Sequence, residues 1–174
     1  MAQETEMNES PFTEIFDLME SAVFIVTADD GKTKGGCTVV WTSRASFEPS
    51  YIALFIAPKR FTHDIIRNAG HFCLNIVGQK HIELARSFGL QSSYDVDKFA
   101  GMALDTSKAG APILRDACAY IDCRLVQEFT VGDHTCFVGE VVAAERLSVE
   151  APLIYKHTDY YPKEGRAGDS QSLS

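Results

Sequence analysis

The chain has 174 residues, of which 45% are hydrophobic and 23% charged, a composition that predicts one globular domain spanning residues 1–174. No apolar run approaches the roughly 20 residues that cross a bilayer, and the acidic amino terminus "MAQETEMNES" lacks the regions of a signal peptide, so we expect a cytoplasmic protein without a membrane partner. The formal net charge of -8 argues against non-specific binding to nucleic acid, because phosphate backbones require basic surfaces.

The amino-terminal third predicts a short helix followed by a β-hairpin. In "SPFTEIFDLMES" the apolar residues recur at helical spacing, with Ser10 as the N-cap and Pro11 at the first helical position. Two β-rich runs follow, residues 22–27 and 33–42. The tripeptide "DDG" between two such runs is a hairpin signal, so the runs are expected to pair.

The middle of the chain alternates strands with short helices. "YIALFIA", residues 51–57, is apolar enough for a strand buried on both faces, and "HFCLNIV" predicts another strand. Between them "THDIIRNAG" predicts a helix with Thr62 as its N-cap and Gly70 near its end. "KHIELARSFG" predicts a second helix that ends at Gly89.

The carboxyl-terminal half predicts a loop and then a long hairpin. The pattern weakens over residues 90–112, where Asp97 and Lys98 are most simply solvated. "CAYIDCRLVQEFTV" and "HTCFVGEVVAAERL" then predict two strands joined by a tight turn at Gly132 and Asp133.

About six strands in hairpins, with only short helices between them, predict a mainly β protein built as an antiparallel barrel. A doubly wound dinucleotide fold would need a glycine-rich turn that opens a helix, whereas "GKTKGG" leads into a strand. Residues 1–10 and the polar tail 163–174 are expected to be disordered.

Positive charge is concentrated in one window of this acidic chain. Residues 31–80 contain seven basic and two acidic side chains, so the window carries +5. We therefore expect any anionic ligand to bind there, although a solvated positive face is the simpler alternative. The basic residues are Lys32, Lys34, Arg44, Lys59, Arg60, Arg67 and Lys80.

"APKRFTHDII" places Lys59 and Arg60 just before the expected helix start at Thr62. Two cations, a hydroxyl and the first amides of a helix would suit a phosphate group. Alternatively, the two cations lie in a solvated loop and Thr62 is only a cap. Arg44 and the hydroxyls of "TVVWTSRAS" favour the phosphate.

The sequence offers little support for a metal site or for a catalytic nucleophile. The five cysteines have no disulfide-framework or metal-ligand spacing, and Cys118 and Cys123 are expected on opposite faces of a strand, so we predict no metal site and a reducing compartment. No G-x-S-x-G elbow is present. A pair of Cys136 with His134 would lack an identifiable orienting group.

Taken together, these segments give the chain a resemblance to the flavin reductase-like family, whose members have the FMN-binding split-barrel fold. The resemblance runs from about Ser21 to Tyr161 and depends on the order and spacing of several segments. These segments are "FIVTADDGKTKGGCTVVWTSRASFEPSYIALFIAPKRFTHDII", "GHFCLNIV", "HIELARSFG", "DKFAG", "CAYIDCRL", "GDHTCFVGEV" and "PLIYKHTDYY".

The resemblance implies three groups of site residues. The strand matching "CTVVWTSRAS" lines the flavin and its ribityl phosphate in relatives, the segment matching "APKRFTHDII" contacts the phosphate, and the "GDH" histidine, here His134, lies near the flavin or nicotinamide as the candidate catalytic residue. Many relatives carry Asn or Ser at Trp41, whose role is therefore open. The implied cofactor-binding residues are Thr38, Val39, Val40, Trp41, Thr42, Ser43, Ser46, Lys59, Arg60 and Thr62.

The resemblance also implies an activity. We expect an FMN-dependent NAD(P)H oxidoreductase, a flavin reductase that passes hydride from NADH or NADPH to FMN and onward to a second acceptor such as a monooxygenase; FAD is the alternative cofactor. A homodimer with flavin at the interface is implied as well. Two other functions stay open: an electron carrier that holds FMN and exchanges electrons with a redox protein, and a haem-binding barrel with His71 or His81 as ligand.

Overall fold

The computed structural model describes residues 12–16 and 18–160. The expectations of disorder at 1–10 and 163–174, and the roles of Ser10 and Pro11 at a helix start, lie outside this range. Within it, the first helix, α1 (Thr13–Phe16), is a single turn. No helix among the described residues has the length and apolar character needed to cross a membrane.

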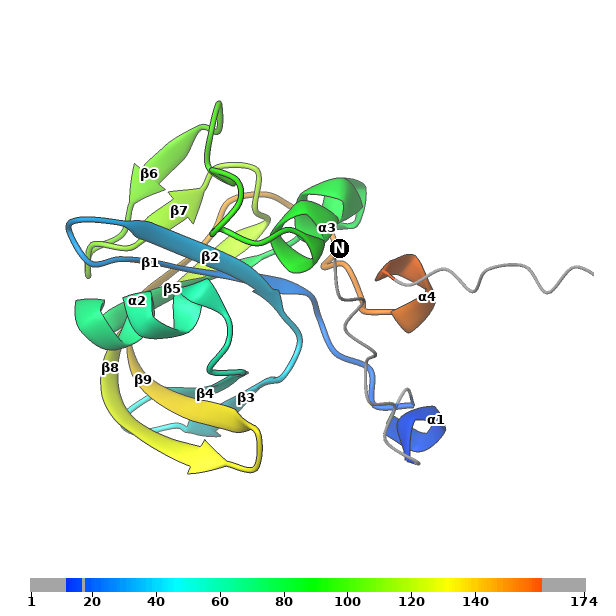
Figure 1. The fold of residues 1–174 in the computed structure, drawn as a ribbon, viewed down its shortest axis with the longest axis horizontal. Coiled ribbons are helices and arrows are strands. Elements are labelled where there is room, and N and C mark those ends of the chain that lie inside the picture. The colour runs from blue at the N-terminus through cyan, green and yellow to red at the C-terminus, as the bar shows by residue number, and fades with distance from the viewer. Residues whose placement is uncertain (1–11, 17, 161–174) are drawn as a thin grey trace, which may run out of the picture.

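A seven-stranded antiparallel sheet forms the body of the molecule (Figure 1). Its strand order is β2-β1-β5-β8-β9-β4-β3, so the predicted antiparallel, mainly β architecture is confirmed. Both predicted hairpins are present, β1 with β2 and β8 with β9. The strands are β1 (Phe24–Asp29), β2 (Lys34–Val39), β3 (Thr42–Ser46), β4 (Tyr51–Ile56), β5 (His71–Ile76), β8 (Ala119–Val131) and β9 (His134–Arg146).

The predicted strand over residues 33–42 is wrong in one respect, because it is two strands at opposite edges of the sheet. β2 ends at Val39 and pairs only with β1, whereas β3 begins at Thr42 and pairs only with β4. Val40 and Trp41 cross between the two edges. β-branched and aromatic residues continue through this crossing without a glycine or proline, so the sequence pattern alone does not reveal the break.

The helix α2 (Phe61–Ala69) fills the space between the β1–β2 arm and the β8–β9–β4–β3 arm of the curved sheet (Figure 1). Ile66 of this helix is fully buried against Phe72 and Phe137 of the sheet in the main core cluster. Burying each such side chain contributes about 1.5–3 kcal/mol. Gly70 ends the helix as predicted, in the left-handed conformation at φ 69°.

A second core lies on the outer face of β1, under the helix α3 (Ile82–Leu90), which packs on β2 and β1 and follows the 3₁₀ turn η1 (Gln79–His81). The prediction that Gly89 ends this helix is wrong. Gly89 lies inside the last turn, where a Cβ would stand 3.3 Å from the Cβ of Thr38. Its missing side chain therefore allows the helix to approach β2. The short helix α4 (His157–Tyr160) packs its Tyr160 on the same core.

The stretch predicted as a loop over residues 90–112 contains an unexpected two-stranded sheet, β6 (Leu104–Thr106) with β7 (Pro112–Leu114). It is fixed to β8 by Asp122, which is fully buried and accepts hydrogen bonds from the Ser107 hydroxyl at 2.7 Å and the Ala109 amide at 2.8 Å. Strands of three residues are too short to show a period, which explains the miss.

All five cysteines are free and buried, and burial raises the pKa of each thiol, to about 12 for Cys123. Thiolate is the reactive species, so we expect fewer than about one equivalent to react promptly with Ellman's reagent at pH 8. After unfolding in guanidinium, all five cysteines should react. Prompt reaction of two or more in the native state would contradict the enclosed packing.

Candidate functional site

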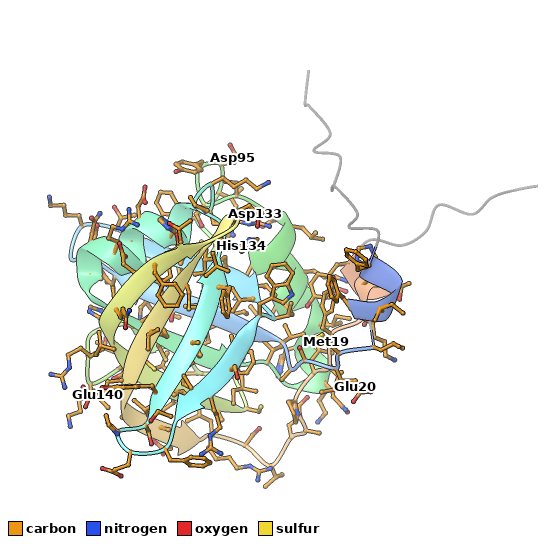
Figure 2. The ribbon with its side chains drawn as sticks, turned by 90° about the horizontal axis from the view of Figure 1, so that it is seen from below. Met19, Glu20, Asp95, Asp133, His134 and Glu140 are labelled. Carbon is orange, nitrogen blue, oxygen red and sulfur yellow. The ribbon has the colours of Figure 1, made fainter. Side chains whose placement is uncertain are left out.

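The ring pair, Trp41 and His134, is the centre of the candidate site. Trp41, the only tryptophan, is 57% exposed, and its ring lies 4.8 Å from the imidazole of His134 at an angle of 47°. The Trp41 carbonyl accepts a hydrogen bond from the Phe55 amide of β4, while His134 opens β9. Figure 2 shows His134 at the tip of the β8–β9 hairpin, at the end of β9 far from Glu140. The fold thus joins two residues that are 93 positions apart in the chain.

Asp133 orients the imidazole of His134. Its carboxylate Oδ1 lies 2.7 Å from Nδ1 of His134. The hydrogen bond and charge of His134 lower the pKa of Asp133, and Lys59 adds a smaller effect of the same sign. A carboxylate only accepts, so Nδ1 carries the proton and Nε2 is left for a ligand.

The cationic pair, Lys59 and Arg60, stands at the amino-terminal end of α2. Arg60 is itself the N-cap, in extended conformation, and no side chain caps this helix. The first amides of a helix have no partner within it, so anion-binding groups gather here. Nη1 of Arg60 makes a long hydrogen bond of 3.4 Å to the Gly89 carbonyl.

The prediction of Thr62 as the N-cap is wrong. Thr62 is the second residue of α2, is 1% exposed, and hydrogen-bonds with the Cys37 thiol. Its hydroxyl therefore serves helix-to-strand packing. The N-cap is Arg60, two residues earlier than expected, and the first helical residue, Phe61, packs against the main core.

The side chains around the strand crossing divide into enclosed and open ones. The Thr38 hydroxyl donates to the Ala85 carbonyl at 2.6 Å, Val39 lies in the main core, and Val40 packs on the outer core. Each of these three thus offers a ligand its backbone rather than its side chain. Thr42 is half-buried, and Ser43 is exposed with its hydroxyl on the Arg44 carbonyl.

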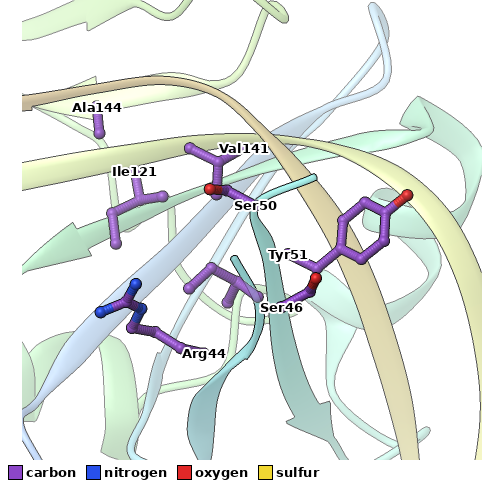
Figure 3. A pocket seen from close by; sticks show the side chains of 8 residues that line it. Arg44, Ser46, Ser50, Tyr51, Ile121, Val141 and Ala144 are labelled. Atoms are coloured by element: carbon purple, nitrogen blue, oxygen red, sulfur yellow. The ribbon is translucent and has the colours of Figure 1, made fainter. Parts of the chain in front are cut away.

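Ser46 lies apart from the ring pair, at the far end of β3, roughly 13 Å from Thr42 at about 3.3 Å per strand residue. There it lines a small pocket of about 190 Å³ with Arg44, Tyr51 and apolar side chains (Figure 3). The structure therefore does not bring Ser46 to the other predicted residues.

A larger hollow of about 610 Å³ adjoins the start of α2 at Phe61. Tyr94 meets Phe61 edge-on at 4.9 Å, and Lys98 closes the inner side. The interpretation of Lys98 as a solvated loop residue is wrong, because its ammonium donates to the Phe88 carbonyl at 2.9 Å and the Gly36 carbonyl at 3.3 Å. Burial, more than nearby Arg60, lowers its pKa.

Sequence reasoning missed His63. This histidine is 3% exposed, with Nδ1 2.8 Å from the Asp64 carboxylate and Nε2 2.9 Å from the Thr135 hydroxyl. The carboxylate, imidazole and hydroxyl form a relay of the kind that activates a nucleophile, but Thr135 is 4% exposed and faces no substrate. The only trace in the sequence is the pair of tripeptides "THD" at residues 62–64 and "DHT" at residues 133–135. Their relation becomes visible only when the fold brings α2 next to β9.

The histidines considered for haem, His71 and His81, each keep one buried ring nitrogen without a hydrogen-bond partner among the described residues, Nε2 of His71 and Nδ1 of His81. Nδ1 of His71 lies 3.0 Å from the Ala69 carbonyl, and Nδ1 of His81 lies 3.9 Å from the Glu150 carboxylate. Neither lines the two pockets described above. In the part of the chain that is described, no three His, Cys, Asp or Glu side chains are grouped as for a metal ion.

Comparisons with known proteins place the chain among flavoproteins. The family model for the flavin reductase like domain matches residues 16–164. The reductase component of 4-nitrophenol 4-monooxygenase/4-nitrocatechol 2-monooxygenase from Rhodococcus opacus is 33% identical over 149 residues, which cover 86% of this chain and 78% of that protein. The ferric-chelate reductase (NAD(P)H) of Archaeoglobus fulgidus is 31% identical over 150 residues, covering 85% and 88%.

The fold comparison agrees. The FMN-binding protein of Thermus thermophilus, solved with 1-cyclohex-2-enone, superimposes with a TM-score of 0.74 at 27% identity, covering 80% of this chain and 84% of that one. The chain also matches diflavin flavoprotein A 1 of Synechocystis at 28% identity, but spans only 24% of that protein's length.

Proposed function

The chain belongs to the flavin reductase-like family, and from that membership we propose that it is an FMN-binding, NAD(P)H-dependent oxidoreductase. The proposal extends to one flavin reductase-like domain over residues 1–174. The observation that carries it is the convergence of the ring pair and the cationic pair at one end of β4 and β9.

The residues present fit a flavin mononucleotide in two respects. Trp41 offers an exposed aromatic face, on which a planar apolar ring system can stack. Lys59 and Arg60, next to the uncapped start of α2, offer positive charge and amides to a phosphate. When bound, flavin accepts a hydride from NAD(P)H and passes the electrons to a second acceptor.

The chain's own residues then have separate tasks. Lys59 and Arg60 hold the phosphate, the backbone at residues 38–42 borders the ring edge, and Trp41 excludes water from one side. His134, oriented by Asp133 through Nδ1, presents Nε2 as an acceptor or, when protonated, as a donor. Preorganised donors of this kind stabilise the negative charge that reduction brings to a bound ring.

A second candidate function is electron transfer with a protein partner. The packing of Trp41 on His134 supports it, because an indole that covers one face of a bound flavin would leave less room there for a nicotinamide. In this case the chain keeps FMN firmly bound and is reduced slowly by either nucleotide.

We propose further that the protein is a cytoplasmic homodimer and that a monooxygenase or another redox protein accepts its electrons. The named function of the Rhodococcus opacus relative supports the monooxygenase partner. Apolar side chains near the amino terminus, among them Phe16 and Met19, are exposed in the single chain. A second copy that covers them would account for this exposure. A sedimentation mass near the 19.2 kDa of one chain would contradict the dimer.

Anaerobic titration tests the leading proposal. Protein reconstituted with FMN should show flavin absorption that NADH or NADPH bleaches, and parallel titrations should identify the preferred nucleotide; reconstitution with FAD decides between the flavins. Bleaching by a reduced redox protein but by neither nucleotide would select the electron carrier. Absence of any flavin band after reconstitution would reject both.

A further inference from the structure

His63 is a buried histidine with both ring nitrogens hydrogen-bonded. Asp64 is mostly exposed and its carboxylate accepts from Nδ1, so Nε2 accepts the Thr135 hydroxyl when the ring is neutral. The ring also packs 5.1 Å from Phe137. Two hydrogen bonds and one aromatic contact thus hold the imidazole in a single orientation.

These contacts join the two halves of the candidate site. His63 lies on α2, three residues after Arg60, and its own amide donates to the Arg60 carbonyl at 2.9 Å. Thr135 directly follows His134 and pairs with Ile56 of β4, the strand that leads into Lys59. The bond from Nε2 to the Thr135 hydroxyl therefore connects the helix start that carries the cations to the strand start that carries the imidazole.

A catalytic role for this relay is excluded by access. Thr135 and His63 are 4% and 3% exposed, so neither reaches a bound molecule directly. A purely structural role does not explain why a histidine stands at this position. An apolar side chain there would fill the core beside Phe137 without the cost of burying a polar ring. What these two roles leave unexplained is that the hydrogen bond from His63 is made to Thr135, the residue next to His134.

We propose that His63 is a positioning residue for His134. By holding Thr135 against α2, it fixes the backbone from which the His134 imidazole projects, and with it the separation between that imidazole and the cationic pair. The inference rests on the proposed function, in which His134 faces the flavin or the nicotinamide. In this proposal the hydrogen bond between α2 and β9 determines where the His134 imidazole lies during flavin reduction and has little effect on the affinity for FMN.

Thr135→Val tests the link, because it removes the hydroxyl and keeps the shape. We expect the rate of flavin reduction at saturating nucleotide to fall about tenfold, with the FMN dissociation constant within about threefold of the original. Thr135→Ser retains the hydroxyl and should retain the rate. Thr130→Val is the matched control, since Thr130 lies directly opposite Thr135 on β8 but is exposed.

A double-mutant cycle decides whether the effect passes through His134. In a His134→Ala background, Thr135→Val should cause less than about a twofold further change, because coupled residues are not additive. Full additivity, or an unchanged rate in folded Thr135→Val, would overturn the proposal. So would a variant whose only change is a lower melting temperature.

A second readout does not depend on activity. The His134 ring protons lie beside the Trp41 indole, so their NMR signals, assigned through His134→Ala, report the ring geometry. Thr135→Val should move them and Thr130→Val should not. If neither nucleotide reduces the original protein, the enzyme proposal fails, and these signals alone then support or reject the positioning of His134.

Discussion

Arg60→Ala is expected to weaken FMN binding about 10- to 100-fold and to leave riboflavin binding within about threefold, because a hydrogen-bonded charge on a phosphate contributes roughly 1.5–3 kcal/mol. Riboflavin has the same ring system without the phosphate, so the ratio of the two affinities isolates the phosphate contact. Lys59→Ala should show the same pattern to a smaller extent, because an ammonium binds phosphate as a single point of charge.

The measurement uses the only tryptophan. Trp41 is exposed beside His134, so its fluorescence should be quenched as either flavin binds. Lys108→Ala, at an exposed lysine in the turn between β6 and β7, controls for the loss of one positive charge from the chain. Equal losses for FMN and riboflavin would show that Arg60 acts on the fold of α2. Unchanged FMN affinity in both variants would place the phosphate elsewhere.

Much of the fold could be predicted because its signals are local. Gly70 and the Gly132–Asp133 turn have sequence patterns that hold almost regardless of their surroundings, and α2 and the long β8–β9 hairpin are present where the patterns indicate. What failed depends on contacts between distant segments. Gly89 continues its helix, and a Cβ there would make a close contact of 3.3 Å with Cβ of Thr38 on β2; no pattern within "LARSFGL" contains that information.

The site was predictable to a similar depth. Residue types suggested the cations, the family resemblance implied Trp41 and His134, and the fold joins the last two. The hydroxyls of Thr38 and Thr62 have partners within the protein, which the sequence does not indicate, because a hydroxyl serves packing as readily as it serves a ligand. His63 was missed for the converse reason, since its role comes entirely from Thr135, 72 residues away.

Gly139→Ala is expected to destabilise the fold by about 2–3 kcal/mol, although alanine is otherwise no worse than glycine in a strand. Gly139 lies on β9, and a Cβ there would stand 2.6 Å from Cζ of Phe72 and 2.7 Å from Cβ of Cys123. Both neighbours are fully buried in the main core, so neither can move aside cheaply. The melting temperature should fall by roughly 4–12 °C for a chain of this size.

A second substitution that enlarges the space around Gly139 tests whether the contact with Phe72 causes this loss of stability. Phe72→Leu removes the outer ring atoms that the new methyl would meet, and by itself leaves a cavity that costs about 1–3 kcal/mol. In the double variant the methyl group occupies part of that cavity, so the combined loss in the free energy of unfolding, measured by urea titration, should be smaller than the sum of the two single losses. Strict additivity would mean that relieving the contact with Phe72 gains nothing, and that the 2.7 Å approach to Cβ of Cys123, rather than the one to Phe72, requires glycine at this position.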